Sequence, residues 1–384
     1  MPRTRDGIVV LVAGYPPAYL GGGPIRTVEA MIETRAGTTT TRVITSGYDH
    51  GASAPLDVPL NRWVRRGRAN VLYVDMTSPI RKLGMYQEIY RARAKVLYLN
   101  SLLSFYFSIL PLALHRAGIL GVDRVVVAPR GELDPGALRL KRRKKSLFLR
   151  TCRALGLHRD VLWHASSDIE AGYIRNFDPS ARVVVKQNET LVHGVDEAHP
   201  PPHNHQVTFA YLGRVSEKKR VHTLIEAAGL VDMPGNFRLV IHGGGDPDYV
   251  ARCKSIADHT DADITFSGAI EHEDVADAFD SADYACFATA GENFGHVVAE
   301  AMARGCPVLI GDVTPWTQRI LNGGGVILAD PSDPSAWART MRDLVKDSGP
   351  DQRINRRRAA LASFRTWDSE RDQKSFLDLL SDKE

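Results

Sequence analysis

The chain has 384 residues, a formal net charge of +4, 43% hydrophobic residues and 24% charged residues. This is ordinary globular composition, which excludes collagen-like, coiled-coil and intrinsically disordered proteins, and so weak a charge does not indicate nucleic-acid binding. The length exceeds what one hydrophobic core usually serves, so we expect two domains.

The first half of the chain alternates short β-branched runs with helical patterns, which is typical of a parallel α/β sheet. We expect strands over residues 8–13, 42–45, 71–74, 96–99, 124–127, 161–164 and 182–185, and helices over 25–33, 102–116, 137–155 and 168–175. The uncharged run 96–114 contains polar residues and a proline, so it predicts a strand, a turn and a buried helix rather than a membrane span.

A Pro/His-rich stretch over residues 199–206 breaks this alternation and predicts a linker. The pattern then resumes, with strands expected over 208–212, 238–242, 264–267, 284–287, 307–310 and 325–328. We therefore predict an α/β fold with two Rossmann-like domains, 1–198 and 207–365, followed by a helix in 366–384. Ligands of such sheets bind outside the carboxyl ends of the strands, so we expect the site in a cleft between the two sheets.

Targeting and redox signals are weak. The first seven residues lack the apolar core of a signal peptide. Four scattered cysteines with no CxxC pair predict neither a disulfide framework nor a zinc site. We expect a soluble protein of the reducing cytoplasm.

The stretch 291–300 (GENFGHVVAE) follows an expected strand and opens an expected helix. Free N–H groups at a helix start, together with the helix dipole, form a phosphate site, and Gly295 would let the ligand approach the backbone. Glu300, about two turns in, could accept both hydroxyls of a ribose. The alternative is that Glu292 caps the helix and Glu300 is solvated.

A second element follows the strand 208–212. Arg214 and Lys219 stand between this strand and the next helix, where two cations could neutralise a pyrophosphate. The alternative is a solvated basic turn.

Together, residues 213–227 (GRVSEKKRVHTLIEA) and 291–309 (GENFGHVVAEAMARGCPVL) resemble the retaining nucleotide-sugar glycosyltransferases of family four. Their GT-B fold has two Rossmann-like domains around a deep cleft. Residues 21–31, 128–145 and 311–316 resemble the branch that builds bacterial surface polysaccharides, and the resemblance covers nearly the whole chain. It implies an acceptor-side first domain, a donor-binding second domain and a final helix that crosses back to the first.

The resemblance also implies roles for individual residues. Arg214 and Lys219 match the pyrophosphate-binding pair, Glu292 the residue that contacts the transferred sugar, and Glu300 the one that holds the ribose. We expect Arg214, Lys219 and Glu292 to be catalytic. The other expected donor-binding residues are Gly22 and Gly23 on a glycine turn, Ile270 near the base, and Asn293, Phe294, Gly295 and His296 around the phosphates. A plain turn is the alternative for the two glycines.

One departure concerns the place after strand 124–127, where many relatives have a histidine near the reacting carbon. Here Arg130 stands between Pro129 and Gly131, and arginine cannot act as a base at neutral pH. We keep Arg130 as an acceptor-side candidate, transfer no catalytic histidine, and predict that His164 and His296 are structural.

Two near-motifs are set aside. Asp261 and Asp263 spell the DXD of a metal-binding glycosyltransferase fold, but they precede an expected strand, so a solvated turn is predicted. Residues 243–246 (GGGD) suggest a dinucleotide loop, but Asp248 occupies the third glycine position and we expect no helix to open there. We predict no cofactor and no metal.

The segment 139–150 carries seven cations in twelve residues. On a helix they could attract anionic lipid at about 1 kcal/mol per cation, which would give peripheral contact with the inner face of a membrane. The alternative is a solvated helix face.

The resemblance implies metal-independent transfer of a sugar, with retention, from a UDP- or GDP-linked donor to an acceptor hydroxyl. The acceptor would be a saccharide, a lipid-linked molecule or a small molecule, in polysaccharide, glycolipid or natural-product biosynthesis. The alternatives are an epimerase or a phosphorylase of the same fold, and a catalytically degenerate scaffold.

Overall fold

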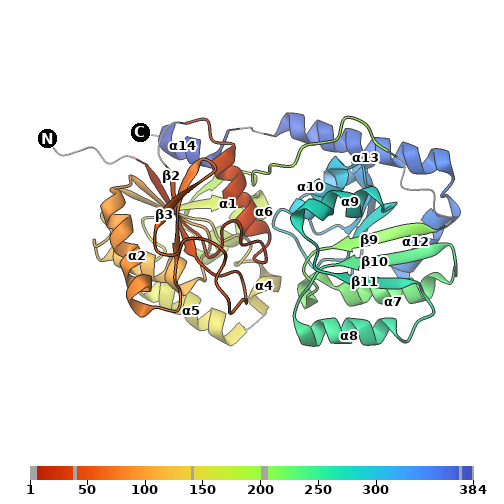
Figure 1. The fold of residues 1–384 in the computed structure, drawn as a ribbon, viewed down its shortest axis with the longest axis horizontal. Coiled ribbons are helices and arrows are strands. Elements are labelled where there is room, and N and C mark those ends of the chain that lie inside the picture. The colour runs from red at the N-terminus through yellow and green to blue at the C-terminus, as the bar shows by residue number, and fades with distance from the viewer. Residues whose placement is uncertain (1–6, 38–40, 140–141, 200–205, 372–373, 383–384) are drawn as a thin grey trace. The chain divides into compact units, whose positions relative to one another are not determined.

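The computed structural model describes residues 7–37, 41–139, 142–199, 206–371 and 374–382. The chain divides into two compact units (Figure 1): unit 1 is Met1–Leu191 together with Asp372–Glu384, and unit 2 is Val192–Arg371. Residues 200–205 of the predicted linker lie outside the described residues. Unit 1 is therefore built from two separate stretches of chain, and unit 2 from one.

Unit 1 holds an eight-stranded sheet in the order β3-β4-β2-β1-β5-β6-β7-β8, parallel except for the β3–β4 hairpin. The strands are β1 Ile8–Leu11, β2 Thr41–Ser46, β3 Trp63–Arg66, β4 Ala69–Val74, β5 Val96–Leu99, β6 Arg124–Val127, β7 Leu162–Ala165 and β8 Arg182–Val185. The helices are α1 Gly23–Glu33, α2 Pro79–Ala92, α3 Leu110–Arg116, α4 Pro135–Arg139, α5 Arg142–Ala154, α6 Asp168–Phe177 and α14 Phe376–Asp382. The switch point, where the order runs both ways, lies between β1 and β5.

The predicted interpretation of residues 96–114 is confirmed. β5 is fully buried, a single π-helical turn covers Phe105–Ile109, and α3 follows directly. A strand buried on both faces reads as a continuous apolar run, which is why this stretch approaches membrane length in the sequence. Within the described residues, no helix is both long enough and apolar enough to cross a membrane.

α14 is part of unit 1 through one buried carboxylate. Asp378 pairs with Arg35 at 3.0 Å and accepts hydrogen bonds from the backbone N–H groups of Ala36 (2.7 Å) and Gly37 (3.0 Å). The two side chains of this ion pair are only 3% and 9% exposed. Phe376 stacks on His164 with 3.7 Å between ring centres. Residues far apart in the sequence thus complete one core.

The surroundings of His164 support the prediction that it is a structural histidine. It is fully buried, 2.8 Å from the hydroxyl of Tyr98 and 3.0 Å from the carbonyl oxygen of Lys186. Burial, and next the positive charge of Arg130, lower the pKa of His164 well below its usual 6.5. The folded protein therefore holds the neutral ring.

We expect His164 to make unit 1 less stable in mild acid. As the pH falls below about 6.5, the unfolded chain gains a proton that the folded protein refuses, so stability is lost by about 1.4 kcal/mol per pH unit. Hydrogen exchange of the β7 amides between pH 5 and 7.5 should show this loss in the wild type and not in His164→Gln. Parallel losses in both proteins would contradict it.

Unit 2 holds a six-stranded, fully parallel sheet in the order β11-β10-β9-β12-β13-β14. The strands are β9 Val207–Leu212, β10 Phe237–His242, β11 Ile264–Gly268, β12 Tyr284–Phe287, β13 Val308–Gly311 and β14 Gly325–Leu328. The helices are α7 Val221–Val231, α8 Pro247–Ala257, α9 Val275–Asp280, α10 His296–Ala303, α11 Thr317–Arg319, α12 Pro334–Lys346 and α13 Pro350–Glu370. Figure 1 shows α7 and α8 on one side of the sheet and α9 and α10 on the other, so the switch point lies between β9 and β12.

An aromatic cluster joins α13 to the segment that precedes α10. Trp316 packs between Phe294 and Trp367, with ring centres 5.5 and 4.8 Å away, and its indole N–H donates to the carbonyl of Phe294. Phe364 adds a further ring 5.5 Å from Trp367. The backbone at the start of α10 is therefore fixed by core packing.

Candidate functional site

The best candidate site lies at the switch point of unit 2. β9 and β12 are neighbouring parallel strands, so the loops that follow them emerge side by side at the same edge of the sheet. The backbone N–H of Ala290 donates to the carbonyl of Lys218 at 2.8 Å, which ties the two loops together. Residues of the two motifs, some 75 positions apart in the sequence, are thereby held in contact.

Lys219 and Glu292 form a direct ion pair between these loops. Lys219 ends a single 3₁₀ turn, Glu217–Lys219, and its side chain is 25% exposed, whereas that of Glu292 is 12% exposed. The pair is thus partly shielded from water, which strengthens its electrostatic interaction with any ligand that approaches.

Arg214 lies on the same loop and is exposed. The hydroxyl of Tyr211 donates to its carbonyl at 2.7 Å, which fixes the backbone of the loop at this residue. Burial, and next the negative charge of Glu292, raise the pKa of Tyr211 well above its usual value, so this donor keeps its proton. Arg214 and Lys219 are both cations on one short, braced segment.

The start of α10 has the geometry that the motif predicts. Gly295 is the N-cap residue with φ +83°, a left-handed conformation that favours glycine. Phe294 is buried beneath it, and Glu300 is buried in the second turn. A Cβ atom at Gly295 would lie 3.6 Å from Cγ of Glu292, so the start of the helix lies next to the ion pair. Ile270 follows β11, two strands from β9 in the sheet, and packs against the unit 2 core.

The glycines of residues 243–245 brace the Arg214 loop. The backbone N–H of Val215 donates to the carbonyl of Gly244 at 2.9 Å. A Cβ atom at Gly243 would lie 1.9 Å from the carbonyl oxygen of Gly213, and one at Gly245 would lie 1.8 Å from that of Val215. Only glycine permits so close an approach of two backbones.

One sequence expectation about this stretch is wrong. A helix does open there, since α8 begins at Pro247, with the side chain of Asp246 accepting from the backbone N–H of Tyr249. An Asp–Pro helix start needs no glycine at position 248, which is why the pattern was missed. Asp261 and Asp263 precede β11, as predicted.

The remaining candidates lie in unit 1. Gly22 is the N-cap of α1 with φ +73°, and a Cβ atom there would meet nothing within 4 Å, so the turn has open space in front of it. Gly23 is the first residue of α1. The loop that holds them follows β1 at the switch point of unit 1.

Arg130 is held by its own unit. Its guanidinium donates to Asn100 (2.8 Å), Tyr98 (2.6 Å) and Asn188, and approaches the sulfur of Met31 at 3.4 Å. These contacts use four of the five N–H groups of an arginine. Arg130 therefore fixes the loops after β5 and β6, with little capacity left for a ligand.

Two acids that the sequence analysis missed, half-buried Glu132 and buried Glu170, order the same edge of unit 1. Glu132 accepts from the backbone N–H groups of Leu102 and Leu103 and from the hydroxyl of Ser101 at 2.8 Å, and burial raises its pKa. Glu170 accepts from the N–H groups of Gly131 and Ser166. The S-x-x-E spacing from Ser167 to Glu170 is a capping signal that could have revealed the second acid.

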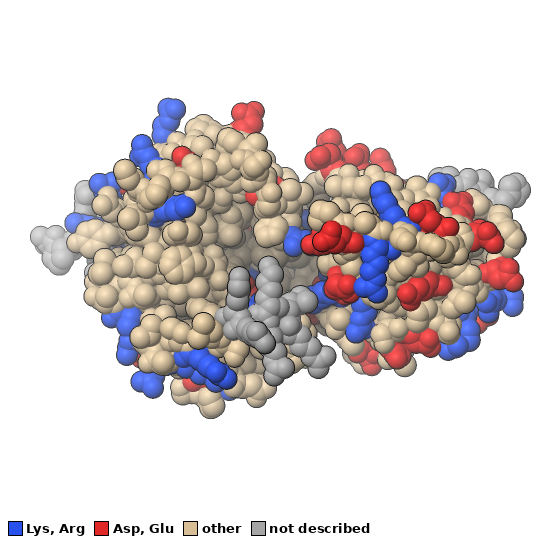
Figure 2. All heavy atoms as spheres, turned by 90° about the horizontal axis from the view of Figure 1, so that it is seen from below, with Lys and Arg blue, Asp and Glu red and all other residues tan. Residues whose placement is uncertain are grey.

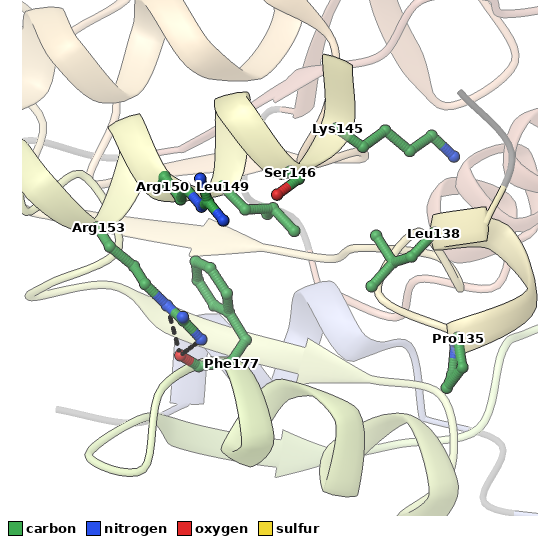
Figure 3. Close-up of a pocket in the computed structure, with 8 residues that line it drawn as sticks. All are labelled: Pro135, Leu138, Lys145, Ser146, Leu149, Arg150, Arg153 and Phe177. Carbon is green, nitrogen blue, oxygen red and sulfur yellow. Dashed lines mark hydrogen bonds between the residues drawn. The ribbon is translucent and has the colours of Figure 1, made fainter. Parts of the chain in front are cut away.

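A pocket of about 530 Å³ lies between α4, α5 and α6 (Figure 3). Arg153 stacks over Phe177 and donates to its carbonyl, and Lys145 donates to the carbonyl of Ala137 at 2.6 Å. The lining residues are Pro135, Leu138, Lys145, Ser146, Leu149, Arg150, Arg153 and Phe177. The side chains of residues 139–144, which carry most of the predicted basic segment, lie outside the described part of the chain.

The two units differ in charge. Unit 1 has 31 Lys and Arg against 19 Asp and Glu, a net charge of +12, whereas unit 2 has 18 against 26, a net charge of −8. On the face in Figure 2, Asp and Glu gather on unit 2, while unit 1 shows mostly Lys and Arg among uncharged residues. The loop that carries Arg214 and Lys219 is therefore a basic segment in an acidic unit.

Residues 196–360, which fall in unit 2, match the family model of glycosyl transferases group 1. A D-inositol 3-phosphate glycosyltransferase of Corynebacterium urealyticum is 29% identical over 157 residues, 38% of this chain and 36% of that protein. A phosphatidyl-myo-inositol mannosyltransferase of Mycobacterium leprae is 33% identical over 145 residues, 36% of this chain and 37% of that protein. The matches thus span little more than a third of these relatives.

Solved structures resemble the chain over nearly its whole length. A sucrose-phosphate synthase from Thermosynechococcus elongatus has a TM-score of 0.72 at 18% identity and covers 95% of this chain and 96% of its own. Anabaena Alr3699/HepE, solved with UDP-glucose, has a TM-score of 0.71 at 17% identity and covers 98% and 100%. The fold is therefore that of the GT-B glycosyltransferases, as predicted, and the match to the group 1 glycosyl transferase model is confined to residues 196–360.

Proposed function

We propose that the protein transfers a sugar from a nucleotide-diphosphate sugar to an acceptor hydroxyl, with retention at the anomeric carbon and without a metal. The observation that carries this proposal is the ion pair of Lys219 with Glu292 beside the start of α10, at the switch point of unit 2, on a loop that also carries Arg214. Negative charge develops on the departing diphosphate, and preorganised cations and helix-start amides are the groups that stabilise such charge.

Each group has a distinct role in this proposal. Lys219 and Arg214 bind the diphosphate, Glu292 binds hydroxyls of the transferred sugar, and Glu300 binds the ribose. A double displacement would need a carboxylate nucleophile at the anomeric carbon. Because Glu292 is assigned to the sugar hydroxyls and already pairs with Lys219, we favour attack from the face of the leaving group. An oxygen of the leaving phosphate then takes the proton of the acceptor hydroxyl.

The donor is proposed to be UDP- or GDP-linked and the acceptor a saccharide, a lipid-linked molecule or a small molecule, in polysaccharide, glycolipid or natural-product biosynthesis. The Anabaena protein was solved in complex with UDP-glucose, and this likeness supports a uridine donor. The excess positive charge of unit 1 supports an anionic surface, such as the inner face of a membrane, as the place where the protein works. In this proposal, segment 139–150 makes the contact.

The donor site is tested by thermal stability with UDP, GDP, dTDP, ADP or CDP. At a hundred times the dissociation constant, a ligand should add about 2.7 kcal/mol to stability. We expect one diphosphate to stabilise the wild type and Glu226→Ala, a helix control, but not Glu300→Ala. A lack of response to all five would favour the scaffold alternative.

The reaction is tested by mass spectrometry and NMR of the products in the presence of a chelator. Retained anomeric configuration and a new glycosidic bond support the proposal. An epimerised sugar with no acceptor product would favour the epimerase, and loss of activity in the chelator would contradict metal independence.

A further inference from the structure

The ion pair between Lys219 and Glu292 joins two groups that the proposed function assigns to different parts of the donor. In that proposal Lys219 binds phosphate and Glu292 binds sugar hydroxyls, yet in the structure the two side chains pair with each other. A ligand whose phosphate binds Lys219 removes the partner of Glu292. Unless the ligand also donates hydrogen bonds to Glu292, this shielded carboxylate is left beside the ligand's own phosphates.

Backbone hydrogen bonds hold the two residues of this pair opposite each other. The backbone N–H of Lys219 donates to the carbonyl of Ser216 at 2.9 Å, and that of Ala290, two residues before Glu292, donates to the carbonyl of Lys218. The two side chains thus extend from anchored backbone positions, so a change of rotamer is enough to separate them. The pair can therefore form again each time the site empties.

The donor and the product nucleotide differ in the groups that they place beside Glu292. A nucleotide sugar brings hydroxyls that can donate to the carboxylate, and its outer phosphate, being esterified, carries a single charge. The free nucleoside diphosphate brings no hydroxyl at that place and ends in a phosphate with a charge of about −1.5 to −2. Like charges a few ångströms apart in a shielded site repel strongly.

We infer that Glu292 weakens binding of the product nucleoside diphosphate once the sugar has been transferred. It does so by pairing again with Lys219 and by repelling the terminal phosphate. This inference rests on the proposed function and adds to it a device for product release. Glu292 then acts in two ways: it binds the sugar during transfer and weakens the hold on the leaving nucleotide afterwards.

Calorimetric titration of UDP and GDP into the wild type and Glu292→Gln tests the inference. The amide keeps the size of the side chain and removes its charge. We therefore expect the diphosphate that the wild type binds, UDP or GDP, to bind about tenfold more tightly to Glu292→Gln. The corresponding monophosphate, UMP or GMP, lacks the terminal phosphate and should bind both proteins alike. Glu292→Asp, which keeps the charge, should retain weak binding of the diphosphate.

A double variant shows whether Lys219 carries the effect. In Lys219→Met, the further change of Glu292 to Gln should give a much smaller gain, because the cation that Glu292 reclaims is gone. Wild-type binding of a diphosphate with no gain in Glu292→Gln would overturn the inference and leave the proposed function standing. If no nucleoside diphosphate binds either protein, the proposed function fails and the inference with it.

Discussion

Replacing Lys219 with methionine is expected to lower kcat by about 10²- to 10³-fold, because removing one preorganised charge partner of a transition state costs about 2.7–4 kcal/mol. The methionine keeps most of the side-chain length, so the 3₁₀ turn and the contacts around it should persist. Steady-state kinetics with the donor that the wild type uses would measure the loss.

The neighbouring residue provides the control. Lys218→Met removes the same charge one position away, while the backbone carbonyl of residue 218 still accepts from Ala290. We expect kcat to stay within about twofold of the wild-type value. A higher KM with unchanged kcat in Lys219→Met would instead mean that Lys219 binds the ground state and the transition state equally.

A side chain at position 245 is expected to damage the proposed donor site without touching a ligand. In Gly245→Ala the new Cβ atom would lie 1.8 Å from the carbonyl oxygen of Val215, so the loop carrying Arg214 must move. A displacement of about 1 Å can cost about 10²-fold in rate, and we expect a fall of that order in kcat/KM.

Gly244→Ala is the matched control, since a Cβ atom there would have the Cβ of Ala269 as its nearest neighbour, at 3.9 Å. It should retain nearly full activity. Equal losses in the two variants would show that the loop after β10 matters for some reason other than close backbone packing.

The positions of most parallel strands along the chain were predictable because fully buried parallel strands give continuous apolar runs. The β3–β4 hairpin was not, because the edge strand Trp63–Arg66 ends in two exposed arginines and looks like a loop. α2 was missed for a similar reason: Ile80, Leu83 and Tyr90 are exposed, so the apolar pattern does not mark one buried face.

The placement of the two motifs after strands of unit 2 was predictable, and because those strands are parallel neighbours the loops share an edge. Their direct pairing through Lys219 and Glu292 was not, since sequence spacing does not show which strands are neighbours. Arg130 was given an acceptor-side role from its place after β6, which the structure leaves as a prediction. Its buried partners became visible only when the loops after β5 and β6 were placed together.

The way α14 completes unit 1 has a consequence for biosynthesis. Unit 2 is one continuous stretch, Val192–Arg371, and can fold as soon as it has been made. The Asp378 carboxylate that pairs with buried Arg35 is added only after all of unit 2, which at about 5–20 residues per second means a delay of roughly ten to forty seconds. During that interval the nascent first unit lacks the carboxylate that pairs with Arg35 and the Phe376 ring that covers His164, and in this period it is most open to chaperones.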